Sequence, residues 1–270
     1  MEVSSVPMRD DGDSVTGVVI LFHDITQLKQ LDDVRKDFVA NVSHELRTPL
    51  SILRGYIETL RDNPDTSPQE LSRILEVMER HSRRLGLLVD DILTLARLES
   101  VNSDLQLSDV SIAQLFQDIG REWEKKLAEK HLRLVVDLAG ELPAVRADEM
   151  RLQEIIYNLL DNAVKYSRDG GEIRLMARPH GNEIELSVSD AGVGIAKEDL
   201  PRIFERFYRA DKARSGEGVR GTGLGLAIVK HIAQLHGGRV EAASQPGGGT
   251  TVRVLIPVQH PAPERLVTQT

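Results

Sequence analysis

The stretch from Phe38 to Leu50 reads FVANVSHELRTPL, and it decides how the N-terminal part of the chain folds. From here onward apolar residues recur at steps of three and four, which predicts one apolar stripe on a long helix. The stripe consists of Val39, Val42, Leu46, Leu50, Leu53, Ile57 and Leu60. Successive helical residues lie about 100° apart, so His44 is on the side opposite Val42 and Leu46. We therefore expect the His44 side chain to face solvent.

An exposed histidine on a helix is most often only a solvated residue, but the neighbours of His44 favour a chemical role. Thr48 lies one turn further along the same face, and Glu45 lies beside the histidine. Pro49 removes a backbone donor and clashes with the carbonyl of Glu45, which predicts a bend in the helix next to His44. A neutral imidazole nitrogen is a competent nucleophile near neutral pH, and an adjacent carboxylate can take the proton from its other nitrogen.

A second helix is predicted after a short break at residues 63–66 (NPDT). Residues 67–70 (SPQE) form a capping box with proline at the first helical position. The heptad seam that follows consists of Leu71, Ile74, Met78, His81, Leu85, Leu88, Ile92 and Leu95. We interpret His81, the one polar member, as a structural position that sets register. Two such antiparallel helices cannot close a core alone, so we predict that two chains pair into a four-helix bundle.

The composition of the 270-residue chain excludes several other classes of protein. A formal net charge of −8 argues against a nucleic-acid binder, which would need a basic surface. The chain has no cysteine, which excludes disulfides, thiolate zinc sites and cysteine nucleophiles. The longest strongly apolar run near the N-terminus is Val18 to Phe22, far shorter than the ~20 residues that span a bilayer. No membrane segment is therefore predicted, and we expect the chain as given to be soluble and cytoplasmic.

The remaining sequence predicts a flexible start and a second, mixed domain. We expect residues 1–15 to be flexible, residues 15–23 to form one strand, and Asp24 or Thr26 to cap a helix that begins near Gln27. Beyond Val101, helix and strand patterns alternate, with Trp123 most simply a packing residue on the first helix. The predicted elements are a helix at 112–130, a strand at 132–138, a helix from Asp148 to about 165, a hairpin at 172–177 and 183–189, a helix at 223–235, and strands at 239–243 and 250–256. This order predicts an α/β sandwich with helices on one face of a mixed, largely antiparallel sheet.

Polar residues on the helix after Asp148 suggest a nucleotide site. Asn158, Asn162 and Lys165 are spaced four and three apart and therefore share one face. An amide oxygen is a hard, neutral ligand suited to Mg²⁺, and a nearby lysine suits phosphate oxygens.

Three further segments follow in order, and each is weak evidence when taken alone. Residues 190–195 (DAGVGI) follow a strand, residues 204–209 (FERFYR) carry aromatics that could simply be core, and residues 221–226 (GTGLGL) open a helix. Glycines at a helix start let backbone N–H groups approach phosphates, although the Lys-Ser/Thr ending of a P-loop is missing. The polar residues 211–220 predict a mobile lid.

The stretch around His44 closely resembles the H-box of histidine kinases. The resemblance implies that His44 is the phosphoacceptor, that Glu45 orients and deprotonates it, and that Thr48 positions water when the enzyme dephosphorylates its partner protein. Residues 158–166, 190–195, 204–209 and 221–226 resemble the N, G1, F and G2 boxes of an ATPase fold. Histidine kinases share this fold with type II topoisomerases, mismatch-repair ATPases and a family of heat-shock chaperones, and the resemblance covers about residues 101–257.

The second resemblance implies ATP and Mg²⁺ as cofactors. It implies that Asn162 holds the metal, that Asp190 reads the adenine amino group, and that Tyr166 packs near the base. Lys165 and Arg209 would contact phosphates, and the glycine-rich loop would cradle them. The expected nucleotide-binding residues are Asn158, Asn162, Lys165, Tyr166, Asp190, Gly192, Gly194, Arg209, Gly221, Thr222, Gly223, Leu224 and Gly225.

Three classes of function compete. The first is a sensor histidine kinase that autophosphorylates His44 from Mg·ATP, transfers the phosphoryl group to an aspartate of a separate response-regulator receiver domain, and also acts as its phosphatase. The second is an ATP-driven machine, but in such relatives a glutamate typically precedes the metal-binding asparagine by one turn, where this chain has Asn158. The third is a non-catalytic dimeric scaffold, although no box is missing. Serine-directed kinases of the same fold lack the H-box hairpin. The sequence therefore favours the histidine kinase hypothesis.

The resemblances also suggest a division of the chain. Residues 1–26 would be the C-terminal remnant of a PAS-like sensor domain, 27–37 a signalling linker helix, 38–100 the dimerisation and histidine phosphotransfer hairpin, 101–258 the catalytic ATP-binding domain, and 259–270 a polar tail. The hairpin and linker look most like those of phosphate-regulon-type sensor kinases. Many such kinases are membrane-anchored, so a longer parent would place this chain at the cytoplasmic side of an inner membrane.

Overall fold

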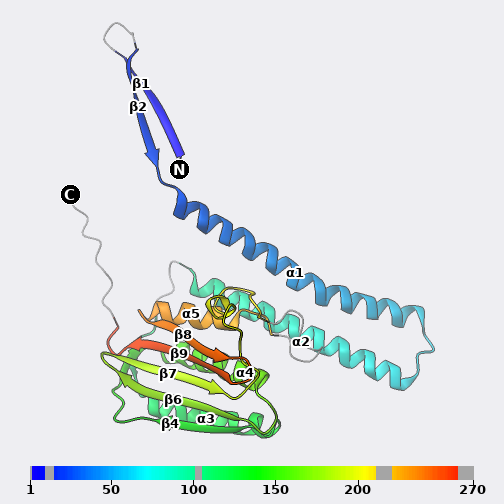
Figure 1. The fold of residues 1–270 in the computed structure, drawn as a ribbon. Helices are drawn as coiled ribbons and strands as arrows, with labels where there is room; N and C mark the ends of the chain where they lie inside the picture. The colour runs from blue at the N-terminus through cyan, green and yellow to red at the C-terminus, as the bar shows by residue number, and fades with distance from the viewer. Residues whose placement is uncertain (1, 10–14, 101–104, 211–220, 261–270) are drawn as a thin grey trace. The chain divides into compact units, whose positions relative to one another are not determined.

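The computed structural model describes residues 2–9, 15–100, 105–210 and 221–260, which fall into two compact units. The units are Met1–Ser82 and Arg83–Thr270, so the boundary lies inside the second long helix. The first unit holds β1 (Glu2–Arg9), β2 (Val15–His23), α1 (Thr26–Asp62) and the first part of α2 (Pro68–Leu98) (Figure 1). The second unit holds the rest of α2 and β3 (Ser108–Val110), α3 (Ile112–Ala128), β4 (Arg133–Leu138), β5 (Val145–Ala147), α4 (Glu149–Tyr166), β6 (Glu172–His180), β7 (Glu183–Asp190), η1 (Leu200–Arg202), α5 (Gly225–Leu235), β8 (Arg239–Gln245) and β9 (Gly249–Pro257).

The N-terminal residues pair as an antiparallel hairpin, so the expectation of a flexible start is wrong for residues 2–9. β1 runs against β2 from Glu2 opposite His23 to Arg9 opposite Val15. Backbone pairing with an apolar strand can order a polar strand whose own sequence has no clear alternation. The apolar side chains of this hairpin are largely exposed, and they are Val3, Val6, Val18, Val19, Ile20, Leu21 and Phe22.

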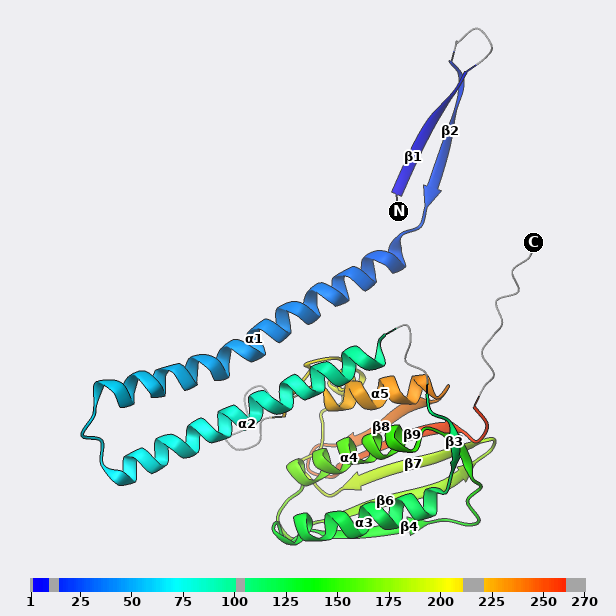
Figure 2. The same ribbon diagram turned by 180° about the vertical axis from the view of Figure 1, so that it is seen from behind.

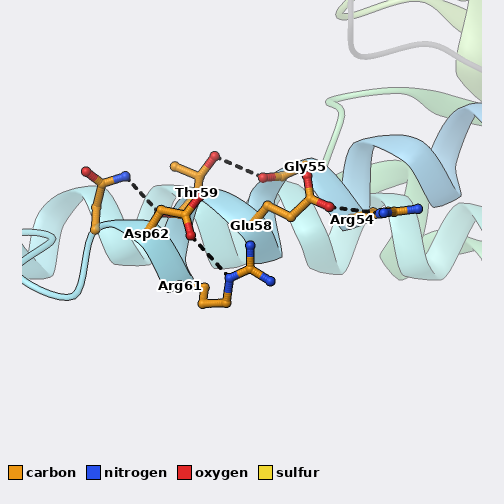
Figure 3. Close-up of polar contacts among 7 residues, drawn as sticks. Arg54, Gly55, Glu58, Thr59, Arg61 and Asp62 are labelled. Atoms are coloured by element: carbon orange, nitrogen blue, oxygen red, sulfur yellow. Dashed lines mark hydrogen bonds and ion pairs between the residues drawn. The ribbon is translucent and has the colours of Figure 1, made fainter.

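α1 begins at Thr26 with Ile25 at the N-cap position and no side-chain cap bond, so the prediction that Asp24 or Thr26 caps the helix is wrong. At its start, Asp24 Oδ1 accepts from the backbone N–H of Thr26 (2.9 Å) and from its hydroxyl (2.6 Å), and these bonds lower the pKa of Asp24. Near its end, the Thr59 hydroxyl donates to the carbonyl of Gly55 (2.9 Å) and Arg61 contacts Asp62 (3.2 Å) (Figure 3). The helix ends at Asp62, directly before the predicted break at residues 63–66, and the Asn63 side-chain amide donates to the carbonyl of Thr59 (2.9 Å).

α2 begins where the capping box predicts. The Ser67 hydroxyl accepts from the backbone N–H of Glu70 (3.3 Å), with Pro68 as the first helical residue. The predicted seam is the better buried side of this helix, since its members Ile74, Leu88 and Leu95 are all buried. Other apolar side chains of the two helices stay exposed in the single chain: Val39, Leu50, Ile57, Leu71, Leu75, Leu87, Val89 and Leu93.

The second unit is built on a five-stranded sheet with the order β4-β6-β7-β9-β8. β4 and β6 are parallel, and every other neighbouring pair is antiparallel. α3, α4 and α5 cover one face of this sheet (Figure 2). The predicted fold class and the larger elements are confirmed. The short antiparallel pair β3–β5 was not predicted, because three-residue strands show no readable periodicity.

The core lies between the sheet and these three helices. Inward-facing residues alternate along β6 and β7, and they are Ile173, Leu175, Ala177, Ile184, Leu186 and Val188, all buried. Trp123 on α3 is also buried, which confirms its packing role. On the strands' other side, the buried Glu185 lies between Arg178 (3.0 Å) and Arg253 (3.6 Å).

Among the described residues, no helix is both long and apolar enough to cross a membrane.

Candidate nucleotide and phosphoacceptor sites

His44 is exposed on α1, as predicted, while Val42 and Leu46 are partly buried. The Thr48 hydroxyl donates to the backbone carbonyl of His44 (3.3 Å), so the threonine lies directly over the turn that carries the histidine. Pro49 is buried and lies within the helix, which continues past it to Asp62. His44 thus presents its imidazole to solvent on a long helix.

α4 carries the first group of predicted nucleotide residues, and a buried histidine fixes its start. Asp148 caps the helix by accepting from the N–H of Arg151 (3.2 Å), and its second oxygen accepts from the N–H of Gln106 (3.0 Å). The N–H of Asp148 itself donates to Nε2 of His236 (3.1 Å), whose Nδ1 lies 2.8 Å from the carbonyl of Ile232.

His236 therefore joins the N-terminus of α4 to the last turn of α5 as a neutral imidazole. Because Nε2 accepts a hydrogen bond, the ring proton must be on Nδ1, where it donates to Ile232. Burial lowers the pKa of His236, against the opposing effect of the Ile232 carbonyl. This link could not be predicted from sequence, because Asp148 and His236 are 88 positions apart.

The far end of α4 meets the glycine-rich loop of residues 221–225. The Asn158 amide donates to the carbonyl of Glu154 (2.9 Å), and a Cβ added to Gly225 would lie 2.7 Å from Asn158 Oδ1. Lys165 forms an ion pair with Asp161, and a Cβ at Gly221 would lie 3.7 Å from its ammonium nitrogen. The lysine and the loop are therefore neighbours, as a shared phosphate site requires.

The turn after β7 packs against the same end of α4. Asp190 Oδ1 accepts from the N–H of Gly192 (2.8 Å), and burial raises the pKa of this carboxyl group despite that bond. A Cβ at Gly192 would lie 2.3 Å from the carbonyl oxygen of Tyr166, which also accepts from the N–H of Val193 (3.3 Å). Only glycine fits this position.

The segment 204–209 crosses the glycine-rich loop. The N–H of Phe207 donates to the carbonyl of Gly223 (2.8 Å), and both residues have a left-handed backbone, with φ of 61° and 76°. A Cβ at Gly223 would lie 2.9 Å from the Phe207 Cα atom. The aromatic side chains of this segment are only partly buried, and the Tyr208 hydroxyl donates to Asp199 (2.6 Å), so they are not simply core. The predicted lid at 211–220 lies outside the described residues.

α5 begins at Gly225, two residues later than predicted, so residues 221–224 are loop immediately before a helix N-terminus. The Thr222 hydroxyl accepts from the N–H of Leu224 (3.3 Å) and donates to Asp91 (2.6 Å). The second unit therefore brings the four predicted segments together around one end of α4. The contact with Asp91 of α2 was not predicted from the sequence.

These residues fit a nucleotide with a lightly held cation. Within the part of the chain that is described, no group of three or more His, Cys, Asp or Glu side chains could hold a metal ion by itself. Mg²⁺ bound with phosphates needs only one or two protein oxygens, and the partly buried amide of Asn162 can supply one.

Comparisons with known proteins decide the family. Residues 147–260 match the model of the histidine kinase-, DNA gyrase B- and HSP90-like ATPase, and residues 34–101 match the His Kinase A (phospho-acceptor) domain. The chain belongs to the histidine kinase family. In agreement with the expected subtype, it is 43% identical over 236 residues to the phosphate regulon sensor protein PhoR of Pseudomonas aeruginosa, covering 86% of this chain and 52% of PhoR.

Solved structures agree with this histidine kinase fold. Full-length ShkA in complex with AMPPNP is 31% identical, with a TM-score of 0.60 over 82% of this chain and 45% of ShkA. Histidine kinase ThkA in complex with the response regulator TrrA has a TM-score of 0.68 at 23% identity, over 94% of this chain and 74% of ThkA. The chain spans about half of PhoR, and 42% of the sensor histidine kinase WalK of Bacillus subtilis, to which it is 35% identical over 95% of its own length.

Proposed function

We propose that this histidine kinase chain transfers the γ-phosphoryl group of Mg·ATP to His44 and then to an aspartate of a separate response-regulator receiver domain. The observation that carries the proposal is the convergence of the four nucleotide segments at one end of α4. The Lys165 ammonium group lies next to Gly221, the Asn158 side chain packs against Gly225, and the Tyr166 carbonyl oxygen packs against Gly192. An exposed histidine on a proline-containing helix supplies the acceptor.

The nucleotide roles follow from the family and from the chemistry of the groups. The partly buried carboxylate of Asp190 would accept from the adenine amino group, and Tyr166 would pack near the base. Lys165, Arg209 and the backbone N–H groups of the loop at 221–225 would hold phosphate oxygens. Asn162 would hold Mg²⁺, which when bound neutralises charge on the phosphates.

The phosphoryl step needs only positioning and one proton transfer. A neutral imidazole nitrogen of His44 attacks the γ-phosphorus, a nitrogen–phosphorus bond forms, and the bond to the β–γ bridging oxygen breaks to leave ADP. Glu45 takes the proton from the other ring nitrogen. In the second step a receiver aspartate oxygen attacks the same phosphorus, the nitrogen–phosphorus bond breaks, and Glu45 returns the proton to the other ring nitrogen, which restores the neutral imidazole. In the phosphatase activity, which removes the phosphoryl group from the receiver domain, Thr48 would orient the water that hydrolyses the aspartyl phosphate.

The helical hairpin would act as a homodimer. Its apolar side chains Leu50 and Ile57 are about half exposed in the single chain, at 51% and 55%. A second copy laying its hairpin against them would remove this area from water, as in a four-helix bundle. The β1–β2 hairpin, with apolar residues exposed, would be the end of a PAS-like sensor domain in a longer parent at the cytoplasmic face of an inner membrane.

Labelled ATP tests the proposal. The chain is incubated with Mg²⁺ and ATP labelled at either the γ- or the α-phosphorus, and His44→Gln is compared with His180→Gln. His180 is an exposed histidine on β6 and serves as the matched control. We expect label only from γ-ATP, retained in His180→Gln and lost in His44→Gln. Release of free phosphate without protein labelling would instead support an ATP-driven machine, and nucleotide binding with neither product would support a scaffold.

A further inference from the structure

The end of α2 makes polar contacts with the nucleotide segments of the second unit. Asp91 Oδ2 accepts from the Thr222 hydroxyl (2.6 Å), and Glu99 forms an ion pair with Arg206 (2.5 Å). The backbone carbonyl of Leu98 lies 3.0 Å from Nε2 of His231 on α5. One face of α2 is thereby attached to the glycine-rich loop, to the segment 204–209 and to α5.

Asp91 lies among the groups that the proposed function assigns to phosphate. Its partner Thr222 belongs to the glycine-rich loop, and Lys165 is close enough to favour the ionised carboxylate. A hydroxyl donor and an ammonium group are the partners that a phosphate oxygen would seek in this loop. The carboxylate therefore stands where an anionic ligand is expected, although it comes from a different helix.

Asp91 is partly buried, and removal from water disfavours a charge at this position. Burial raises the pKa of Asp91, and the hydrogen bond from Thr222 and the charge of Lys165 only partly oppose that effect. Its neighbour Asp90 is exposed on the same helix. Asp161 is also near, but it belongs to α4 and is already paired with Lys165. Asp91 is thus the acidic group that α2 contributes to the phosphate site.

We propose that Asp91 is a stand-in anion for the nucleotide phosphates, which must displace it from Thr222 in order to bind, so that Asp91 sets the nucleotide affinity. The single hydroxyl proton of Thr222 cannot be donated to both anions at once. A phosphate at the loop would also repel the nearby carboxylate. Nucleotide binding therefore opposes the attachment of this part of α2, and that attachment in turn weakens binding. This inference rests on the proposed function, because it assumes that the loop holds phosphates.

Nucleotide titration of the whole chain tests the inference. Calorimetry measures the dissociation constant of Mg·AMPPNP for wild type, Asp91→Asn and Asp90→Asn. Asparagine keeps the shape and can still accept from Thr222, so the fold is retained while the charge is removed. We expect Asp91→Asn to bind about tenfold more tightly, and the matched control Asp90→Asn to change by less than about twofold.

Adenosine separates an electrostatic role from a structural one. Adenosine has no phosphates, so its affinity should be equal in wild type and Asp91→Asn if the carboxylate competes with phosphate. An equal gain for adenosine and Mg·AMPPNP would overturn the inference, and so would unchanged or weaker Mg·AMPPNP binding by Asp91→Asn. A folded wild-type chain that binds no Mg·AMPPNP at all would instead overturn the proposed function, on which the inference depends.

Discussion

Gly194→Ala should destabilise the second unit far more than Gly181→Ala, although both change a glycine with a left-handed backbone. The φ angle is +70° at Gly194 and +62° at Gly181. A left-handed backbone is disfavoured for an L-residue by about 1–2 kcal/mol, so both variants lose about this much. Their surroundings differ. A Cβ at Gly181 meets nothing within 4 Å, whereas a Cβ at Gly194 would lie 1.9 Å from the carbonyl oxygen of Gln245.

The overlap at Gly194 can be relieved only by moving the turn after β7 away from the end of β8. That movement would strain two hydrogen bonds, from the N–H of Ile195 to the Ser244 hydroxyl (2.8 Å) and from the N–H of Gly247 to the carbonyl of Val193 (2.7 Å). Overpacking of this kind costs about 1–3 kcal/mol, and each lost bond about 1 kcal/mol. We therefore expect a loss of about 4–7 kcal/mol for Gly194→Ala when both bonds are lost, and about 1–2 kcal/mol for Gly181→Ala.

Urea unfolding followed by tryptophan fluorescence measures this difference. Trp123 is the only tryptophan, and it is buried on α3, so its emission reports the second unit alone. The Gly194→Ala midpoint should fall well below that of Gly181→Ala, with a similar slope. Gly194→Ala should also lose Mg·AMPPNP binding, because the turn that holds Asp190 is displaced. Equal free energies of unfolding for the two variants would refute this reasoning.

Three further predictions concern other parts of the chain. Burial in the folded state lowers the pKa of His236, so the stability that its neutral form contributes is present above 6.5, the pKa in the unfolded chain, and is lost as pH falls below that value. In urea unfolding, the free energy of unfolding of His236→Gln should therefore fall less between neutral and acidic pH than that of the wild type, and an equal fall in both would contradict a neutral His236. Ser67→Ala should destabilise the helical hairpin by about 1 kcal/mol through loss of the cap bond to Glu70, seen as a lower melting temperature by circular dichroism, while the exposed Ser82→Ala should change little. Ile57→Glu should weaken dimerisation by about 2 kcal/mol per chain in analytical ultracentrifugation, whereas the exposed Ser51→Glu should not, and equal effects would argue against a dimer face that includes Ile57.

The long helices could be predicted because their signals are local. The three- and four-residue steps, the break at 63–66 and the cap at Ser67 each involve residues close in sequence, and the structure shows α1, the loop and α2 where these signals indicate. β1, β3 and β5 could not be predicted in this way. Each is short or polar and is ordered by a partner strand, and pairing between strands leaves no mark within either segment.

In the candidate sites too, local features could be predicted from the sequence and long-range contacts could not. The glycine positions were identified from their motifs, and their close approaches to Tyr166 and Gln245 explain why glycine is needed there. The links between segments were not foreseen. Thr222 and Asp91 are 131 positions apart, and their hydrogen bond depends on how the end of α2 packs against the sheet domain. Sequence spacing carries no information about such a contact, so an acidic group at the glycine-rich loop could be found only in the structure.

Mapping the phosphorylated residue tests the central claim most directly. The chain is incubated with Mg·ATP, digested at neutral or alkaline pH to preserve an acid-labile phosphohistidine, and sequenced by electron-transfer mass spectrometry. We expect one dominant modified residue, His44, with the modification absent from Asn162→Ala. Phosphate on another residue, or modification of His44 that persists in Asn162→Ala, would contradict the proposed acceptor or the proposed nucleotide site, respectively.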